Sequence, residues 1–196
     1  TLHRGVVDIR LVDGTIESIE SAGTADLNLT TEPGGVEIID ATGLVAVPGL
    51  INAHTHSPMV LMRGAAEDVD GATWFNDLIW PMEANLTAEH VHAGARLACA
   101  EMLLGGVTAF ADHYFAPQQI ARAARELGIR ADLAPTFFTE PGGAGRDAAF
   151  DEVRALATTA DDLVRVSVGP HAVGTVDDDD LVATAELAAE LGLRVH

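Results

Sequence analysis

The fold is decided by one stretch, Val47-Pro48-Gly49-Leu50-Ile51-Asn52-Ala53-His54-Thr55-His56. It starts as an apolar strand and ends in two histidines that are separated by one residue. Because alternate side chains of a strand share a face, His54 and His56 are expected to point together from the strand's carboxyl end, where two imidazoles can hold one metal ion. The spacing alone is weak evidence, since the 8 histidines of the 196-residue chain give about 0.3 His-x-His pairs by chance.

From Leu44 onward, apolar strand runs alternate with amphipathic helical segments, a pattern typical of βαβ units around a parallel sheet. Strands are predicted near 45–53, 107–113, 129–137, 164–170 and 193–196, and helices near 87–104, 117–127, 147–159 and 178–191. The predicted helix boundaries are an N-cap at Thr87 and stops at Gly105-Gly106, Gly128 and Gly192. Four βα units and a fifth strand are the first half of an eight-unit barrel, or else most of an open doubly wound sheet. The phosphate loops typical of the open sheet are missing.

The first 45 residues have a different pattern. Val6–Val12 and Thr15–Glu20 alternate on either side of Asp13-Gly14, which predicts a β-hairpin. Strand character returns at Val36–Asp40 after a polar, glycine-rich stretch. Three strands are marginal alone, so this unit is expected to pack on other parts of the protein.

Composition excludes several classes of function. The chain has 11 Lys and Arg against 30 Asp and Glu, a formal charge of -19, which argues against nucleic acid or an anionic membrane as partner. No apolar run reaches the ~18 residues that a membrane helix needs. The start of the chain lacks the features of a secretory signal, so a cytoplasmic protein is expected. Cys99 is the single cysteine, which rules out an internal disulfide and predicts a buried, inert thiol.

Further motifs surround the histidine pair and carry a resemblance. They are Met62-Arg63-Gly64, Trp74, Trp80-Pro81-Met82-Glu83, Glu101-Met102-Leu103, Gly106–Asp112 and Gly169-Pro170-His171. Together with Pro48–His56 they resemble the metal-dependent amidohydrolase superfamily, and within it the branch of S-adenosylhomocysteine and 5′-methylthioadenosine deaminases and related chlorohydrolases. The resemblance covers almost the whole chain.

The resemblance implies a distorted (β/α)₈ barrel that carries a small β-sandwich built from both chain ends. We therefore expect an α/β protein in which residues 1–45 are the N-terminal part of the β-sandwich domain. Residues 46–196 would be the first four βα units and the fifth strand of the barrel. The sequence would then be part of a longer enzyme, with the proton-carrying glutamate and aspartate of the family beyond residue 196.

The resemblance also implies one divalent metal ion, zinc first and iron as the alternative, held by His54, His56, two later histidines and an aspartate. It places the third metal histidine at the end of strand 193–196, and two positions stay open: His196 itself or a residue two places further on. The implied reaction is hydrolytic loss of ammonia from a ring carbon of a purine-like base.

Three residues match substrate contacts of the family. Glu83 matches an acid that accepts hydrogen bonds from ribose hydroxyls, with a solvated acid at a helix start as the alternative. His171 matches a substrate contact at a strand end, and a hydrogen-bonded structural histidine is the alternative. Trp74, in the long loop after the first barrel strand, either walls a purine site or fills the core of its own loop.

Other positions bear on the choice of substrate. Arg146 lies where some family members place an arginine for a substrate carboxylate, although a surface arginine is an equal interpretation. Pro135 replaces a second arginine of that kind, and Gly174 replaces an aromatic residue, which weakens the case for S-adenosylhomocysteine. His113 replaces a methionine and is expected either to contact the substrate or to be hydrogen bonded beside the site.

The first hypothesis is a metal-dependent aminohydrolase that acts on an adenosine-like or other heteroaromatic substrate. A chlorohydrolase or another amidohydrolase of the same superfamily is the near alternative. A third hypothesis, of a different class, is a non-catalytic metal-binding or assembly module. The expected partner is a small-molecule substrate, and homo-oligomer formation is left open.

Overall fold

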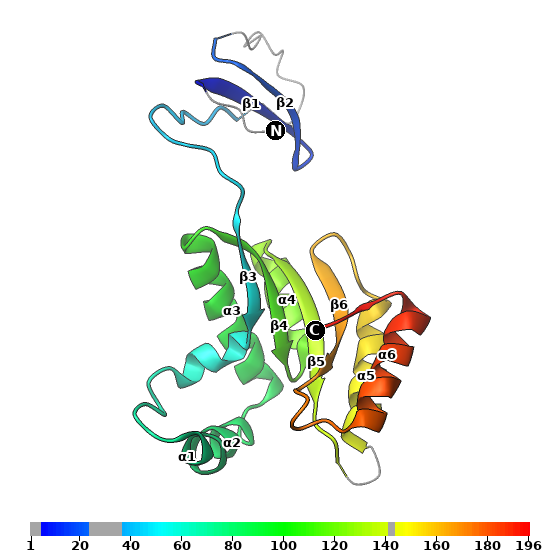
Figure 1. Ribbon diagram of the computed structural model, residues 1–196. Coiled ribbons are helices and arrows are strands. Elements are labelled where there is room, and N and C mark those ends of the chain that lie inside the picture. The colour runs from blue at the N-terminus through cyan, green and yellow to red at the C-terminus, as the bar shows by residue number, and fades with distance from the viewer. Residues whose placement is uncertain (1–4, 24–36, 141–143) are drawn as a thin grey trace. The chain divides into compact units, whose positions relative to one another are not determined.

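The computed structural model describes residues 5–23, 37–140 and 144–196 (Figure 1). They divide into two compact units, Thr1–Ala46 and Val47–His196, each described here by itself. The first unit contains a hairpin of β1 (Val7–Val12) and β2 (Thr15–Ser21). Its assignment to a β-sandwich domain stays a prediction.

The hairpin turn follows from its two central residues. Val12 pairs with Thr15, so only Asp13 and Gly14 connect the strands, and both have positive φ angles, 48° and 73°. Two left-handed residues form the turn that matches the twist of a two-stranded ribbon. The predicted hairpin is thus confirmed. The predicted strand at Val36–Asp40 is wrong for residues 37–40, which pair with no strand among the described residues. Val36 lies outside the described residues.

The second unit is built on a five-stranded parallel sheet in which each strand pairs with the next along the chain. The strands are β3 (Leu50–Thr55), β4 (Val107–Tyr114), β5 (Arg130–Phe137), β6 (Val164–Pro170) and β7 (Arg194–Val195). A doubly wound sheet reverses its strand order, whereas a barrel does not. The strand order therefore selects the half-barrel of the two sheet architectures that the sequence allowed.

The first barrel strand is shorter than predicted. It begins at Leu50, which pairs with Val107, rather than near residue 45. Residues before Leu50 have no neighbouring strand, since β4 itself starts at Val107, and Pro48 has no backbone N–H to donate. An apolar run is thus not sufficient for a strand where no partner strand lies beside it.

Four helices connect the strands, α3 (Ala88–Leu104), α4 (Pro117–Leu127), α5 (Ala144–Ala157) and α6 (Asp178–Leu191). The predicted N-cap is confirmed, because the Thr87 hydroxyl accepts from the His90 backbone N–H and the His90 ring accepts in return. The predicted stops are confirmed at Gly105, Gly128 and Gly192. No described helix has both the length and the apolar character needed to cross a bilayer.

The stretch between β3 and α3 was expected to be a long loop, but most of it is helical. It contains η1 (Ser57–Met62), α1 (Gly71–Thr73), the π-helical η2 (Trp74–Ile79) and α2 (Trp80–Glu83). Asp70 is the N-cap of α1, because its side chain accepts hydrogen bonds from the backbone N–H groups of Ala72 and Thr73. Trp74 and Glu83 therefore lie on helices.

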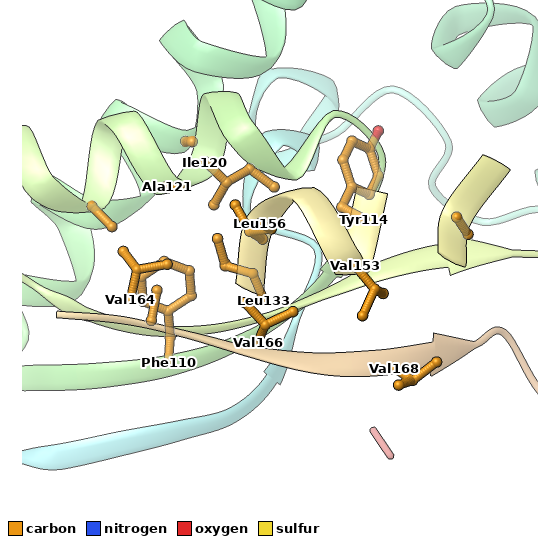
Figure 2. Packing of buried hydrophobic residues seen from close by; sticks show 14 of the residues in the cluster. Phe110, Tyr114, Ile120, Ala121, Leu133, Val153, Leu156, Val164, Val166 and Val168 are labelled. Carbon is orange, nitrogen blue, oxygen red and sulfur yellow. The ribbon is translucent and has the colours of Figure 1, made fainter. Parts of the chain in front are cut away.

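The core lies between the strands and the helices that cover one face of the sheet (Figure 2). Phe110 of β4, Leu133 of β5 and Val166 of β6 point toward Ile120 of α4 and Val153 of α5, and all five side chains are buried. Because side chains alternate along a strand, positions between these core residues face the opposite side of the sheet. His113 of β4 takes such a position.

Candidate functional site

Five histidines gather around the carboxyl ends of the barrel strands, and we call them the histidine cluster. They are His54 and His56 at β3, His113 in β4, His171 after β6 and His196 after β7. The ring centres of His54 and His56 lie 4.9 Å apart, and those of His54 and His196 lie 5.0 Å apart. The carboxyl edge is where barrel enzymes place their functional groups.

His56 is held in one orientation by the backbone of the neighbouring strand. Its Nδ1 donates a hydrogen bond to the carbonyl oxygen of His113. A carbonyl only accepts, so Nδ1 carries the proton and Nε2 keeps its lone pair when the ring is neutral. In metal sites, a histidine that binds the ion through one ring nitrogen usually donates a hydrogen bond from its other ring nitrogen, often to a backbone carbonyl.

His54 faces His196 directly. Nδ1 of His54 lies 2.8 Å from Nε2 of His196, and the two rings are stacked with an interplanar angle of 4°. Burial lowers the pKa of His54 below its ordinary value, and positive charge on His56, His196 or His171 would lower it further. The neutral imidazole is the form that binds a metal ion.

The donor chemistry of the cluster fits a borderline divalent metal such as zinc, because neutral imidazoles are preferred ligands of that ion. The oriented ring of His56 is the structural observation that supports this fit. Among the described residues, however, no group of three or more His, Cys, Asp or Glu side chains is arranged so that it could hold a metal ion. The assignment of His54 and His56 as ligands therefore stays a prediction.

His113 is hydrogen bonded beside the site, which is one of the two alternatives stated for it; the other was contact with the substrate. It is buried, and its Nε2 donates to the carbonyl oxygen of Gly169 over 3.1 Å, which joins β4 to β6. Burial lowers the pKa of His113 to about 4. A Cβ atom on Gly169 would lie 2.9 Å from the His113 ring and 2.7 Å from the Pro135 carbonyl oxygen. Glycine is therefore required where these strands approach.

His171 is flanked by an aromatic side chain that the sequence did not indicate. The ring of Phe138 stacks on His171 with centres 4.3 Å apart, and the Thr175 hydroxyl lies 2.7 Å from Nδ1 of His171. The Trp80 ring is edge-on to the Phe138 ring, with centres 6.3 Å apart. Ring contacts thus connect Trp80 with His171 through Phe138. Trp74 packs edge-on against Phe75 at 4.7 Å, and Phe75 in turn lies 5.5 Å from Trp80.

Glu83 lies on α2 and is bound by the last residue of β4. The Tyr114 hydroxyl donates to Oε1 of Glu83 over 2.7 Å. The Tyr114 ring centre lies 6.2 Å from that of His56, so this acid is attached next to the histidine cluster. Burial, and then the hydrogen bond to Glu83, raise the pKa of Tyr114 above its ordinary value.

Arg146 is occupied by carboxylates of its own chain. Its Nη1 donates to Asp180 over 2.7 Å, and a second ion pair joins it to Asp147 at 2.9 Å. Asp180 is buried and also accepts from the Thr139 hydroxyl. These contacts connect the start of α5 with the start of α6, and they are not contacts with the histidine cluster. The prediction that Arg146 binds a substrate carboxylate stays a prediction.

Asp112 is a buried acid that supports the segment after the histidine pair. Its Oδ2 accepts from the backbone N–H of Ser57 over 3.1 Å, while Oδ1 has no partner among the described residues. Burial raises the pKa of Asp112 to about 7. Since Ser57 follows His56 directly, this hydrogen bond fixes the chain where it leaves β3.

A half-barrel of parallel strands with histidines along its carboxyl edge is the architecture of a barrel hydrolase. Residues 45–196 match the Amidohydrolase family, and the chain belongs to that family.

Two similar relatives within the family are named as deaminases. The chain is 39% identical over 183 residues to the 5′-deoxyadenosine deaminase of Methanothermobacter thermautotrophicus, covering 91% of this chain and 43% of that protein. It is 35% identical over 201 residues to a 5-methylthioadenosine/S-adenosylhomocysteine deaminase of Haloarcula marismortui, covering 100% of this chain and 45% of that protein. The chain thus spans less than half the length of these relatives.

Solved structures agree with the half-barrel. An adenosine deaminase from Xanthomonas campestris with bound zinc matches with a TM-score of 0.71 and 36% identity over 76% of this chain and 35% of that one. An atrazine chlorohydrolase from Arthrobacter aurescens in complex with zinc matches with a TM-score of 0.80 and 25% identity over 97% of this chain and 47% of that one.

Proposed function

We propose that this protein is a metal-dependent aminohydrolase that deaminates adenosine-like nucleosides, with zinc as its metal. The observation that carries the proposal is the position of Glu83, a carboxylate attached through Tyr114 beside the histidine cluster. The deaminase names of the relatives and the zinc in the related adenosine deaminase support it.

In this proposal His54 and His56 hold the metal, together with His196 or a nearby third histidine. The bound ion supplies a water molecule activated as a nucleophile at neutral pH. His171, held between Phe138 and Thr175, contacts the purine, and Glu83 accepts hydrogen bonds from the ribose. Trp74 and Trp80 contribute apolar surface on the same helical segment. We also propose that the protein works in the cytoplasm.

A chlorohydrolase is the second candidate. Two observations favour it. The fold similarity to the atrazine chlorohydrolase covers 97% of the chain, and Gly174 leaves the position three residues after His171 without an aromatic side chain. Glu83 favours the nucleoside instead, because a neutral triazine ring offers no pair of hydroxyl donors for a carboxylate.

Measurement of ammonia and chloride release by the metal-loaded native protein separates the candidates. The substrates are adenosine, 5′-deoxyadenosine, methylthioadenosine, S-adenosylhomocysteine, adenine and a chlorotriazine. We expect ammonia from the ribosides, with less from adenine. Chloride release without deamination would replace the proposal by the chlorohydrolase, and no release from any substrate would favour a non-catalytic module.

A further inference from the structure

Tyr114 has a buried ring in the core and a hydroxyl group at the edge of the core. The side chain is 3% exposed and belongs to the apolar cluster on the helix side of the sheet. In Figure 2 its hydroxyl points away from the aliphatic side chains of the core. A buried tyrosine hydroxyl needs a hydrogen-bond partner, and Oε1 of Glu83 at 2.7 Å is that partner.

The direction of this hydrogen bond is fixed by chemistry. An ionised carboxylate only accepts, so the phenol donates. The raised pKa of Tyr114 keeps the phenol protonated, and it therefore remains a donor throughout the neutral range. Hydrogen bonds from a neutral donor to an ionised acceptor are stronger than those between neutral groups.

The bond engages one oxygen of Glu83 and leaves the other available. Among the described residues, no further group donates to this carboxylate. A carboxylate with one oxygen fixed has its second oxygen presented in a defined direction, which suits a ligand that brings hydroxyl donors.

Glu83 needs such a fixed point because its own element is short. Helix α2 has 4 residues and packs mainly against the preceding π-helix η2. Tyr114, in contrast, ends β4, which pairs with a strand on each side in the parallel sheet. The phenol therefore joins an acid on a short helix to the sheet of the second unit.

We propose that Tyr114 is a positioning residue that holds Glu83 in place to receive the vicinal hydroxyls of a riboside. The inference rests on the proposed function and adds a residue that determines recognition of the sugar. Tyr114 acts through Glu83 and does not itself contact the substrate. Its effect is therefore expected in riboside binding and not in the chemistry at the base.

The test compares Tyr114→Phe, Glu83→Gln and the double variant in the metal-loaded native protein. Adenosine is compared with 2′,3′-dideoxyadenosine, which lacks both hydroxyls. We expect Tyr114→Phe to raise KM for adenosine about tenfold or more, in line with the loss of one hydrogen bond to a charged group. We expect kcat to change less than about twofold, and the constants for dideoxyadenosine to stay near wild type. In the Glu83→Gln background, Tyr114→Phe should have little further effect.

Thr184→Val is the matched control, because it also removes a buried hydroxyl, one that donates to the Asp180 carbonyl within α6. It should leave the ratio of the two KM values unchanged. Thermal melting of each variant, and calorimetric binding of the product inosine, provide readouts apart from turnover.

Equal losses with both substrates, or full additivity with Glu83→Gln, would overturn the role of Tyr114 while the proposed function stands. Failure of Glu83→Gln to distinguish the two substrates would overturn the ribose contact itself, and the role of Tyr114 with it.

Discussion

The carboxyl group of Asp112 is buried, and burial disfavours its ionised form. It is 1% exposed, receives one backbone hydrogen bond and has its pKa raised to about 7 by burial. The folded protein therefore binds a proton at this residue that the unfolded chain releases near pH 4. Its contribution to stability is complete below pH 4 and is lost as the pH rises toward 7.

We expect Asp112→Asn to reduce this pH dependence. The amide oxygen still accepts from the Ser57 N–H, but no proton is released between pH 4 and 7. Each pKa unit corresponds to about 1.4 kcal/mol, so the decline removed is on the order of a few kcal/mol. Urea unfolding of both proteins at several pH values measures it, and parallel stability curves would contradict the expectation.

Sequence patterns indicated those site residues that short motifs identify by themselves. His54 and His56 were singled out by their spacing on a strand and by the resemblance of the stretch Pro48–His56, and the structure brings their rings together. Phe138 and Tyr114 were not assigned roles, because these roles depend on contacts with His171 and Glu83 on other elements. Sequence spacing carries no information about such contacts between distant segments.

Helices α5 and α6 are joined at their amino ends by Arg146, and the buried Asp180 depends on this cation. We expect Arg146→Ala to destabilise the protein by about 1–3 kcal/mol, because a buried carboxylate loses its partner. Arg154→Ala is the control on α5, since its ion pairs with Asp151 and Glu190 are exposed and worth about 0–1 kcal/mol. Chemical denaturation measures both.

The same variant also examines the predicted substrate role of Arg146. A loss of kcat/KM with S-adenosylhomocysteine that exceeds the loss with methylthioadenosine would support a contact with the carboxylate. Equal losses would leave Arg146 with the helix-joining role alone.

Element types followed from the sequence where local signals were strong. The caps at Thr87, Gly128 and Gly192 act within one helical turn and were predicted. The strand at Val36–Asp40 was wrong for its described residues, because an apolar run becomes a strand only when a partner lies alongside. The π-helix at Trp74–Ile79 has no comparable sequence signal.

On the scale of the second unit, the proposed metal would connect β3 with the later strands of the sheet. Binding to the folded state alone stabilises that state, by about 2.7 kcal/mol at a metal concentration of 100 times Kd. We therefore expect a chelator to lower the melting temperature of the native protein. The double variant His54→Ala and His56→Ala should retain no metal and should melt at one temperature with or without chelator. Undiminished zinc in that variant, measured by elemental analysis, would contradict the assignment.

The contact between His54 and His196 spans 142 positions of the chain. Closing a loop of that length costs more entropy than forming a local helix or hairpin, so we expect such contacts to form late in folding. We therefore expect the histidine cluster to form only when the sheet assembles, so that the partly folded chain binds metal ions weakly. Zinc uptake followed by a fluorescent indicator during refolding should lag behind helix formation seen by circular dichroism.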